Sequence, residues 1–528
     1  MNTTLLSLWA LYATMLVLAA LYGRTLLRTG SPGKSPAEKR LVIITLIATV
    51  TYVGFLVYKI YDVVFDVHNW IRVEKTFVVA MGHPLYTPKD SGPAMANIYG
   101  PVSVFAYWPA TWSRDPMIAL RIAELIALSF FFFPAFWLHL SRTGITETSV
   151  LERSAAFLAF GMAATLLTSL RNAAFTVHAD APTFGLCTLA CGVIYFSKGG
   201  LSWKRLWVSA SFAALAVWSK QVVVLLFIAV TVFIGLRNGR KDAFRYLFCF
   251  ALAGLLISSF FLLCFDPKNM FFNMITVPSH HPLKAGGFPT FLKAFTKLSR
   301  EWLIILLWGV FSMGPRILEV KKYPSFRLWF TDHPWTLFIF AGIAMIPISL
   351  LSFLKVGGSN NTLSYPNFFF LLASTLAFLA PRRSEERRNL KALAILLSFL
   401  SLVHVPGLFA RIYQTKDKVN FGLIAYRYAL AHPGKTYFAR MTLINLLADG
   451  KVYHTIDGLM DRYWAGFPIV GEHLRAHIPP QADLMALCLE NDKWLLPLEE
   501  FPSGRIGAEG LPEFTVYKRV PAVASEPS

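Results

Sequence analysis

The chain has 528 residues, of which 55% are hydrophobic and only 15% are charged, and its net charge is +20. This composition excludes an ordinary soluble globular protein and predicts a polytopic membrane protein. The charge does not indicate nucleic-acid binding, because most of the net positive charge lies in six short loops between apolar segments. These loops are 24–40, 141–153, 198–205, 237–245, 316–328 and 382–391. They hold 23 Lys or Arg and 7 Asp or Glu residues, which accounts for +16 of the net charge.

About twelve apolar segments predict an all-α membrane fold with about twelve transmembrane helices. The longer ones reach or approach the ~20 residues that a spanning helix needs. They are 5–22, 41–57, 118–140, 247–264, 335–351 and 390–408. The shorter ones are 155–170, 183–196, 206–218, 222–236, 302–313 and 368–379. No basic residue precedes the first segment, so we interpret it as a retained helix rather than a signal peptide.

The basic loops also predict which side of the membrane each connection occupies. Short loops rich in Lys and Arg lie in the cytoplasm. The remaining connections, and both chain termini, are therefore expected on the outer side of a cell inner membrane. These outer connections are 61–117, 171–182, 219–221, 265–300, 353–367 and everything after about 411.

The first outer loop, 61–117, contains an amphipathic segment at 65–81. Trp70 and Ile71 lie on one side of it, and polar residues such as Arg72 lie elsewhere. This pattern is typical of a helix that lies in the membrane interface. The Gly-His-Pro sequence that follows is expected to end the helix.

The last part of the chain differs in composition from the membrane segments. Turn signals separate short apolar runs, and 514–517 has the character of a strand. We therefore predict two domains, a membrane domain over 1–411 and a small soluble α/β domain over 412–528 on the outer side. Residues 522–528 are expected to form a disordered tip.

Two acidic residues stand at the start of predicted helices in the outer loops. Asp66 begins the amphipathic segment, with Asp62 as a second choice one turn earlier, and Asp180 lies beside Pro182. Each has an ordinary explanation as a helix N-cap. A carboxylate that caps a helix is also held in a fixed orientation. Two such carboxylates on the same side of the membrane favour a functional role.

Two lysines lie on the same predicted side. Lys220 occupies a short turn between apolar segments, where it either extends towards the lipid headgroups or binds a lipid-linked phosphate. Lys355 begins the sequence Lys-Val-Gly-Gly-Ser-Asn-Asn at 355–361, in which the glycines let backbone amides approach a phosphate closely. The pair Cys187 and Cys191 has helical spacing and is best explained as small buried side chains.

Six short motifs follow one another along these outer loops. They are Asp66, Gly82-His83-Pro84-Leu85-Tyr86, Tyr99-Gly100-Pro101, His178-Ala179-Asp180, Ser219-Lys220-Gln221 and Gly358-Ser359-Asn360-Asn361. Their order and sidedness resemble those of the GT-C superfamily of membrane glycosyltransferases, in its bacterial aminoarabinose and protein O-mannosyl transferase branch. The resemblance covers about residues 41–410. Val67 replaces an acidic residue common in that branch, which argues against a metal site built from an Asp-Glu pair.

This resemblance implies transfer of a sugar from a polyprenyl-phosphate donor to a glycan, lipid or protein acceptor, with inversion at the sugar carbon. Asp66 is the expected general base, and Lys220 and Lys355 the expected phosphate clamp. Asp180 is expected to bind hydroxyl groups or to orient the site. The other expected substrate-binding residues are Tyr86, Tyr99, His178, Asn360 and Asn361. No cofactor is implied, and a role for a divalent cation is left open.

Two other classes of function are compatible with such a sequence. A transporter or lipid flippase is expected to show repeated halves with broken helices at matching positions, and we find no such repeat. A scaffold protein is expected to tolerate loss of Asp66.

Overall fold

The computed structural model describes residues 36–140, 150–197, 200–380, 393, 395–402, 419–488 and 493–520. The predicted helix at 5–22, the domain boundary at 411 and the C-terminal tip lie outside these residues. The predicted segment at 390–408 is described only in part.

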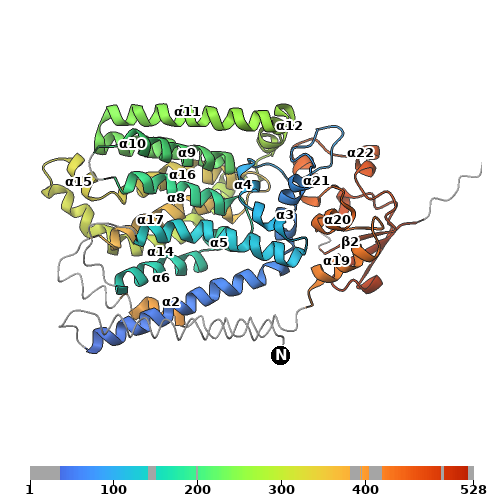
Figure 1. The fold of residues 1–528 in the computed structure, drawn as a ribbon, viewed down its shortest axis with the longest axis horizontal. Coiled ribbons are helices and arrows are strands. Elements are labelled where there is room, and N and C mark those ends of the chain that lie inside the picture. Colours follow the sequence, from blue (N-terminus) through green and yellow to red (C-terminus); the bar gives the residue numbers. More distant parts are fainter. Residues whose placement is uncertain are drawn as a thin grey trace, which may run out of the picture.

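Most of the described chain forms a bundle of long helices, with the C-terminal residues packed against one end of it (Figure 1). The long helices of this bundle are α2 (Pro36–Asp62), α5 (Pro116–Leu140), α6 (Val150–Leu166), α8 (Asp180–Tyr195), α9 (Trp203–Ser219), α10 (Leu226–Asn238), α11 (Arg240–Cys264), α14 (Gly287–Leu318), α16 (Thr336–Leu354) and α17 (Ser364–Phe378). Shorter helices join them or cover their ends, namely α3 (Val67–Ala80), α4 (Val102–Phe105), α7 (Thr168–Ala174), α12 (Pro267–Phe271), α13 (Val277–His280) and α15 (Phe326–Asp332).

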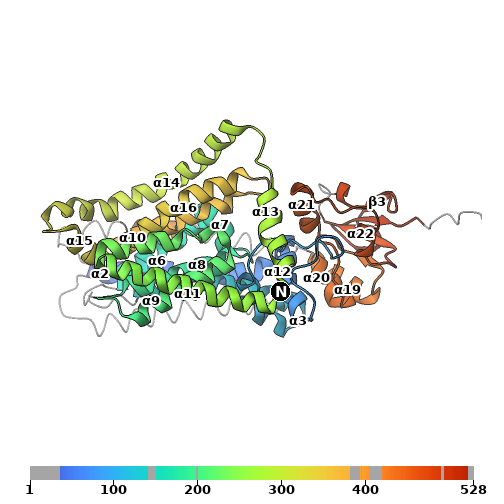
Figure 2. The ribbon, with the colours of Figure 1, turned by 90° about the horizontal axis from the view of Figure 1, so that it is seen from above.

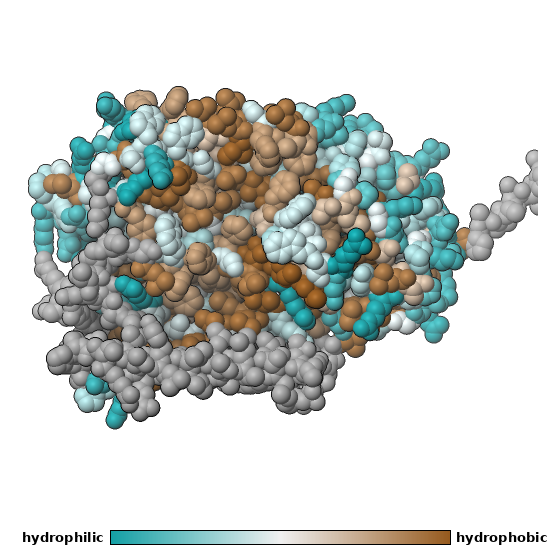
Figure 3. All heavy atoms as spheres, in the orientation of Figure 1, coloured by the Kyte–Doolittle hydropathy of each residue, from teal (hydrophilic) through white to brown (hydrophobic). Residues whose placement is uncertain are grey.

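The bundle is that of a helical membrane protein. Among the described residues, five helices are long and apolar enough to cross a membrane, or six if α6 and α7, bent by 99°, form one broken span. Helices α8 and α9 fall just short, with 16 and 17 residues. The predicted count of about twelve therefore stays a prediction. Figure 3 shows an apolar surface over the bundle between hydrophilic regions at its two ends.

The two kinds of predicted loop lie at opposite ends of the bundle. The basic loop between α10 and α11, and the segment around α15, lie at the end far from the C-terminal residues (Figure 1). Helices α3, α4 and α12, which belong to the motif-bearing loops, lie at the near end. The alternation in the sequence thus corresponds to two ends of one structure.

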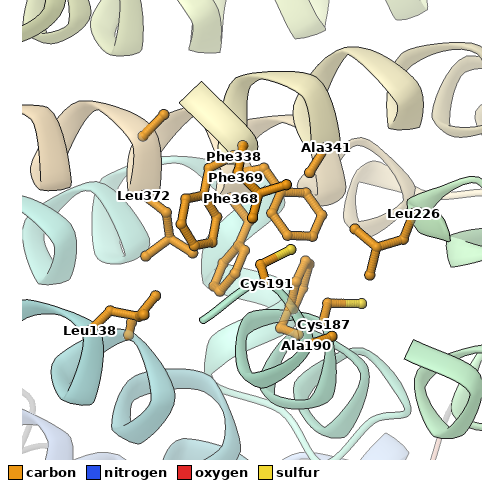
Figure 4. Packing of buried hydrophobic residues seen from close by; sticks show 14 of the residues in the cluster. Leu138, Cys187, Ala190, Cys191, Leu226, Phe338, Ala341, Phe368, Phe369 and Leu372 are labelled. Carbon is orange, nitrogen blue, oxygen red and sulfur yellow. The ribbon is translucent and has the colours of Figure 1, made fainter. Parts of the chain in front are cut away.

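A dense apolar core holds α5, α8, α10, α16 and α17 together. Phe184 of α8 stacks on Phe368 of α17 with 4.3 Å between ring centroids. Cys187 and Cys191 are buried and point into this core (Figure 4), which confirms their interpretation as packing residues. Close packing of this kind places the ends of α8 and α17 side by side.

The C-terminal residues form a small α/β unit, as the sequence predicted. Its sheet has the order β1-β2-β4-β3, with β1 parallel to β2 and the other neighbours antiparallel. Its strands are β1 (Thr436–Tyr437), β2 (Leu484–Leu487), β3 (Ser503–Ile506) and β4 (Thr515–Lys518). Its helices are α19 (Phe421–Ala431), α20 (Thr442–Asp449), α21 (Ile456–Trp464) and α22 (Gly471–Ala476).

Helix α3 joins the two parts. It forms where the amphipathic pattern predicts a helix, and Gly82, with φ +82°, follows its end. Its apolar side was expected to face the membrane interface, but Trp70 and Phe77 are buried in a cluster with residues of α5, α19 and α20. A Cβ at Gly422 would collide with the Trp70 ring, so this contact is close. The amphipathic pattern of α3 therefore reflects burial of its apolar side against other parts of the protein.

The segment 265–300, predicted as an outer loop, is also structured. It contains α12, α13 and the first half of α14, which is 32 residues long. The apolar run at 302–313 captured only the middle of α14. In Figure 2, α12 and α13 bring the chain from the end of α11 to the C-terminal unit.

Candidate active site

A buried charge network lies at the start of α8. Asp180 is fully buried, and its Oδ1 accepts hydrogen bonds from Lys220 Nζ and Tyr365 Oη, both at 2.5 Å. Its Oδ2 accepts a hydrogen bond from Asn361 Nδ2 at 2.9 Å and lies 2.7 Å from His178 Nδ1. Asp180 does not cap its helix, so the ordinary explanation from the sequence does not hold for this residue.

Aromatic rings complete the environment of the network. Lys220 Nζ lies 5.0 Å from the centre of the Tyr99 ring and 5.5 Å from that of Tyr365. Tyr107 Oη donates to the carbonyl oxygen of His178 at 2.7 Å. Burial lowers the pKa of His178 to about 4, although Asp180 opposes the shift. The imidazole is therefore neutral near pH 7.

A tight backbone approach explains why Tyr99 reaches this position. Gly100 lies so close to the Trp218 backbone that a Cβ would collide with it. Gln221 Nε2 donates to the Ile98 carbonyl oxygen at 3.1 Å, and Pro101 starts α4. Only glycine permits such an approach, so the motif around Gly100 fastens the first motif-bearing loop to the turn that holds Lys220.

A cavity of about 280 Å³ lies next to this network, between the bundle and the C-terminal unit. Its lining includes Tyr99 and His178, and two further parts of the lining, here called walls, are provided by α3 and α21. The polar and aromatic residues on these walls are His68, Arg72 and Lys75 of α3 and Asp457, Asp461 and Trp464 of α21. The cavity thus has a basic wall from the first motif-bearing loop and an acidic wall from the C-terminal unit.

The charges on the two walls are not fully compensated. Arg72 has a buried Nη1 with no hydrogen-bond partner in the described part of the chain. Lys75 donates to the Ala96 carbonyl oxygen, and burial lowers its pKa to about 8. Burial raises the pKa of Asp461 to about 7, with a further contribution from the Asp457 charge. Both walls can therefore gain or lose charge near neutral pH.

Asp66 does not itself line this cavity, but it lies two residues before His68, which does. Asp66 is the N-cap of α3, and its Oδ1 accepts a hydrogen bond from His68 N at 3.0 Å. It is half-buried and is not among the residues that line the cavity, whereas His68 is. The carboxylate thus orients the start of the helix that forms the basic wall.

The other predicted residues divide into two groups. Asp180, Lys220, His178, Asn361 and Tyr99 lie together in or beside the network.

Of the remaining three, two are hydrogen-bonded outside the network and the third is hydrogen-bonded to the backbone of Tyr99. Lys355 Nζ donates to the Pro278 carbonyl oxygen at 2.8 Å, and Asn360 Oδ1 accepts from Lys297 Nζ at 2.9 Å. Tyr86 Oη donates to the Tyr99 carbonyl oxygen at 2.8 Å, so it supports Tyr99 from behind.

Sequence reasoning missed most of the cavity walls. A signal was present for α3, because His68, Arg72 and Lys75 follow an i, i+4, i+7 spacing that places them on one helix face. Asp457 and Asp461 have the same kind of i, i+4 spacing, in a segment whose position relative to the bundle cannot be deduced from its pattern. Tyr365 carried no local signal.

The described residues include no cluster suited to a metal ion. Among the described residues, no group of three or more His, Cys, Asp or Glu side chains is placed to hold a metal ion. A role for a divalent cation stays untested.

Comparisons with known proteins define the fold. No protein-family model matches the chain, and no curated protein matches it in sequence. The crystal structure of ArnT from Cupriavidus metallidurans bound to undecaprenyl phosphate is similar over 91% of this chain and 99% of that chain, with TM-score 0.52 and 10% identity. The same protein in the apo state is similar over 92% and 99%, with TM-score 0.51 and 11% identity.

The chain therefore has the fold of these solved structures, which agrees with the GT-C-like membrane fold expected from its motifs. The particular solved protein that it resembles over nearly its full length is ArnT.

Proposed function

We propose that this protein transfers a sugar from a polyprenyl phosphate to an acceptor at the outer face of the membrane. The observation that carries the proposal is the cavity lined by a basic and an acidic helix, beside a buried charge network at the end of a membrane bundle. The similarity to an ArnT structure bound to undecaprenyl phosphate supports a lipid-linked phosphate as the ligand.

In this proposal the donor phosphate binds the wall formed by Arg72 and Lys75. Arginine suits a phosphate because its guanidinium offers several N–H donors in one plane, and Nη1 of Arg72 has no partner within the described chain. Lys220 was predicted as part of the phosphate clamp, but its ammonium group is already paired with Asp180 at 2.5 Å. We assign Lys220 and Asp180 to positioning Tyr99 and His178 beneath the bound donor.

The reaction needs a base and alignment more than an acid. The acceptor hydroxyl loses its proton to Asp66, which caps α3 two residues before the cavity residue His68. The acceptor oxygen attacks the sugar carbon from the side opposite the phosphate. The bond between that carbon and the phosphate oxygen breaks, and polyprenyl phosphate leaves with the electron pair. Attack from opposite the leaving group inverts the configuration. A positioned base contributes about 10²–10⁴-fold, and alignment contributes several kcal/mol more.

The test is an assay of purified protein in detergent with undecaprenyl-phosphate sugars, in which sugar transfer and release of undecaprenyl phosphate are measured. Asp66→Asn should lower the rate by about 10²–10⁴-fold while it keeps the helix cap, because asparagine caps helices as well as aspartate does. Asp62→Asn is the matched control, since Asp62 is paired with Lys59 at 3.2 Å and is expected to be dispensable.

The same assay separates the competing proposals. Transfer that is unchanged in Asp66→Asn would reject this base. Movement of the lipid across vesicle membranes without loss of its sugar would instead support a transporter or flippase.

A further inference from the structure

Helix α21 of the C-terminal unit forms one side of the cavity. Asp457, Met460, Asp461 and Trp464 all line the cavity. These positions follow an i, i+3, i+4, i+7 spacing, so one face of the helix is turned towards the cavity. Arg72 of α3 lines the same cavity.

The position of α21 is set by contacts with the membrane domain. Thr455 N donates to the Ala94 carbonyl oxygen at 2.8 Å, and Thr455 Oγ1 caps the helix through Gly458 N. His281 Nε2 donates to the Asp461 carbonyl oxygen at 3.1 Å. Figure 2 shows α21 beside α13, the element that precedes His281. The helix is therefore held as part of the cavity.

The side chains of α21 differ in how they are used. Tyr463 points away from the cavity and packs on Trp494, with 4.6 Å between ring centroids. Trp464 is half-buried at the cavity wall, edge-on to the His281 ring. The Asp461 carboxylate lies 3.8 Å from His281 Nε2, which is beyond hydrogen-bonding distance. The cavity face of α21 thus combines an indole ring with a carboxylate that is not hydrogen-bonded to that imidazole.

We propose that Asp457, Asp461 and Trp464 form the acceptor subsite, and that the acceptor group bound there is a neutral, hydroxyl-rich sugar. The proposal rests on the proposed function, because the donor phosphate is placed on the wall formed by α3. Carboxylates accept hydrogen bonds from sugar hydroxyl groups. An indole offers a rigid apolar surface to the C–H face of a sugar ring.

Electrostatics separates the two substrates. Asp457 is paired with Arg440 at 3.3 Å, so the repulsion of an anionic acceptor falls mainly to the Asp461 carboxylate, while Arg72 and Lys75 attract the phosphate. The cavity, at about 280 Å³, is close to the lower limit of ligand cavities, which hold roughly 300–1,000 Å³. It therefore accommodates the reacting end of each substrate, with the rest of both molecules outside it.

The experiment is saturation-transfer NMR on the full chain in detergent micelles. The probes are the methyl glycosides of glucose, galactose, mannose and N-acetylglucosamine, with methyl glucuronide as an anionic counterpart. At least one neutral glycoside should receive saturation from the wild type, and methyl glucuronide should receive none. Trp464→Ala and Asp461→Asn should each lower the signal at least fivefold.

Two control variants share the location but not the proposed role. Tyr463→Ala removes the neighbouring aromatic ring that faces Trp494, and Asp483→Asn removes an exposed carboxylate of the same unit. Both should retain the wild-type signal. An equal signal in Trp464→Ala and the wild type, no signal with any neutral glycoside, or binding of the glucuronide as strong as that of the glucoside would overturn the subsite.

Binding of undecaprenyl phosphate distinguishes this proposal from the proposed function. It should be unchanged in Asp461→Asn and Trp464→Ala and weakened in Arg72→Gln. If the wild type does not bind this lipid but the glycoside signal still depends on Trp464, the donor assignment fails and the sugar subsite stands. If the lipid binds normally and the glycosides do not, the subsite alone fails.

The pH dependence gives a readout that packing alone would not produce. Since the pKa of Asp461 is raised to about 7 by burial, its carboxyl group changes charge near neutral pH. Rejection of methyl glucuronide by the wild type should therefore weaken from pH 8 to pH 6, and Asp461→Asn should make it less dependent on pH. A wild-type selectivity that is constant over this range would contradict the role of Asp461.

Discussion

Two charged regions meet at the same end of this molecule and differ in how their charges are compensated. In the network around Asp180, four partners surround one carboxylate within hydrogen-bonding distance. In the adjoining cavity, Arg72 keeps a buried N–H group without a partner in the described chain, and Asp461 stays 3.8 Å from His281. A buried charge is stable only with its partners. The first region therefore holds structure, and the second is available to ligands.

Breaking the compensated region should have the largest effect on stability. Asp180→Asn leaves the Lys220 ammonium buried without a counter-charge, which should cost about 3–5 kcal/mol. The measurement is thermal unfolding of the protein in detergent, with a strongly lowered midpoint expected. The double variant Asp180→Asn with Lys220→Met should recover most of the loss, because neither residue then carries a charge. A double variant as unstable as the single one would show that the ion pair is not the cause.

Neutralising the basic wall should affect function and leave stability nearly unchanged. Arg72→Gln and Lys75→Met should each lower the rate of sugar transfer by about a hundredfold, as loss of one preorganised group at a developing charge does. The measurement is transfer from undecaprenyl-phosphate sugars, together with the unfolding temperature of each variant. Lys451→Gln, at an exposed lysine of the C-terminal unit, is the control. An equal loss of transfer rate in Arg72→Gln, Lys75→Met and Lys451→Gln would contradict the assignment of Arg72 and Lys75 to phosphate binding.

Displacing the acidic wall should have an intermediate effect. A Cβ at Gly458 of α21 would collide with the backbone of Ala94, which cannot move cheaply. Gly458→Ala should therefore destabilise the docked C-terminal unit by about 1–3 kcal/mol. Limited proteolysis should cleave the variant faster than the wild type. Gly254→Ala, in α11 where a Cβ has open space, should leave the rate of cleavage unchanged.

The last expected effect is graded with pH, is small near neutral pH, and concerns the support of the acidic wall. His454 Nδ1 accepts a hydrogen bond from Ala94 N at 2.7 Å, and burial lowers the pKa of this imidazole to about 3. Below the unfolded pKa of about 6.5, the unfolded chain gains a proton that the folded chain does not bind. Stability should thus fall as pH decreases from about 6.5 towards 3, by at most about 1.4 kcal/mol per pH unit.

This dependence can be measured from unfolding temperatures between pH 7.5 and pH 5. His454→Asn keeps an acceptor for the Ala94 amide and should reduce the slope. His432→Asn, at an exposed position, is the control. A slope that is identical in His454→Asn and the wild type would show that other groups cause the acid sensitivity.

The apolar runs were sufficient to predict much of the bundle. Helices α2, α5, α11 and α16 each contain a long predicted segment, because a helix buried in lipid or protein must be apolar over its whole length. Helix α3 was predicted from its amphipathic period, and it ends at Ala80, close to Gly82. The period could not show that Trp70 would be buried against protein, since lipid and a protein core select the same residues.

The candidate site was predicted only in part from the sequence. Asp180, Lys220 and Asn361 belong to loops of the same predicted side, and that side is one end of the bundle, where they are hydrogen-bonded to one another. Tyr365 was not found, because it is one of several aromatic residues in an apolar helix and only its register against α8 brings its hydroxyl group to Asp180.

The sequence by itself thus determined the membrane class, the main helices and the end of the bundle at which the polar motifs gather. These properties follow from local hydrophobicity and from the placement of charge in loops, both of which can be read along the chain. Only the tertiary structure decided that Asp180 is compensated while Arg72 and Asp461 line one cavity. That distinction depends on distances between residues far apart in the sequence, which are set by the packing of helices and by the docking of α21 against the membrane domain.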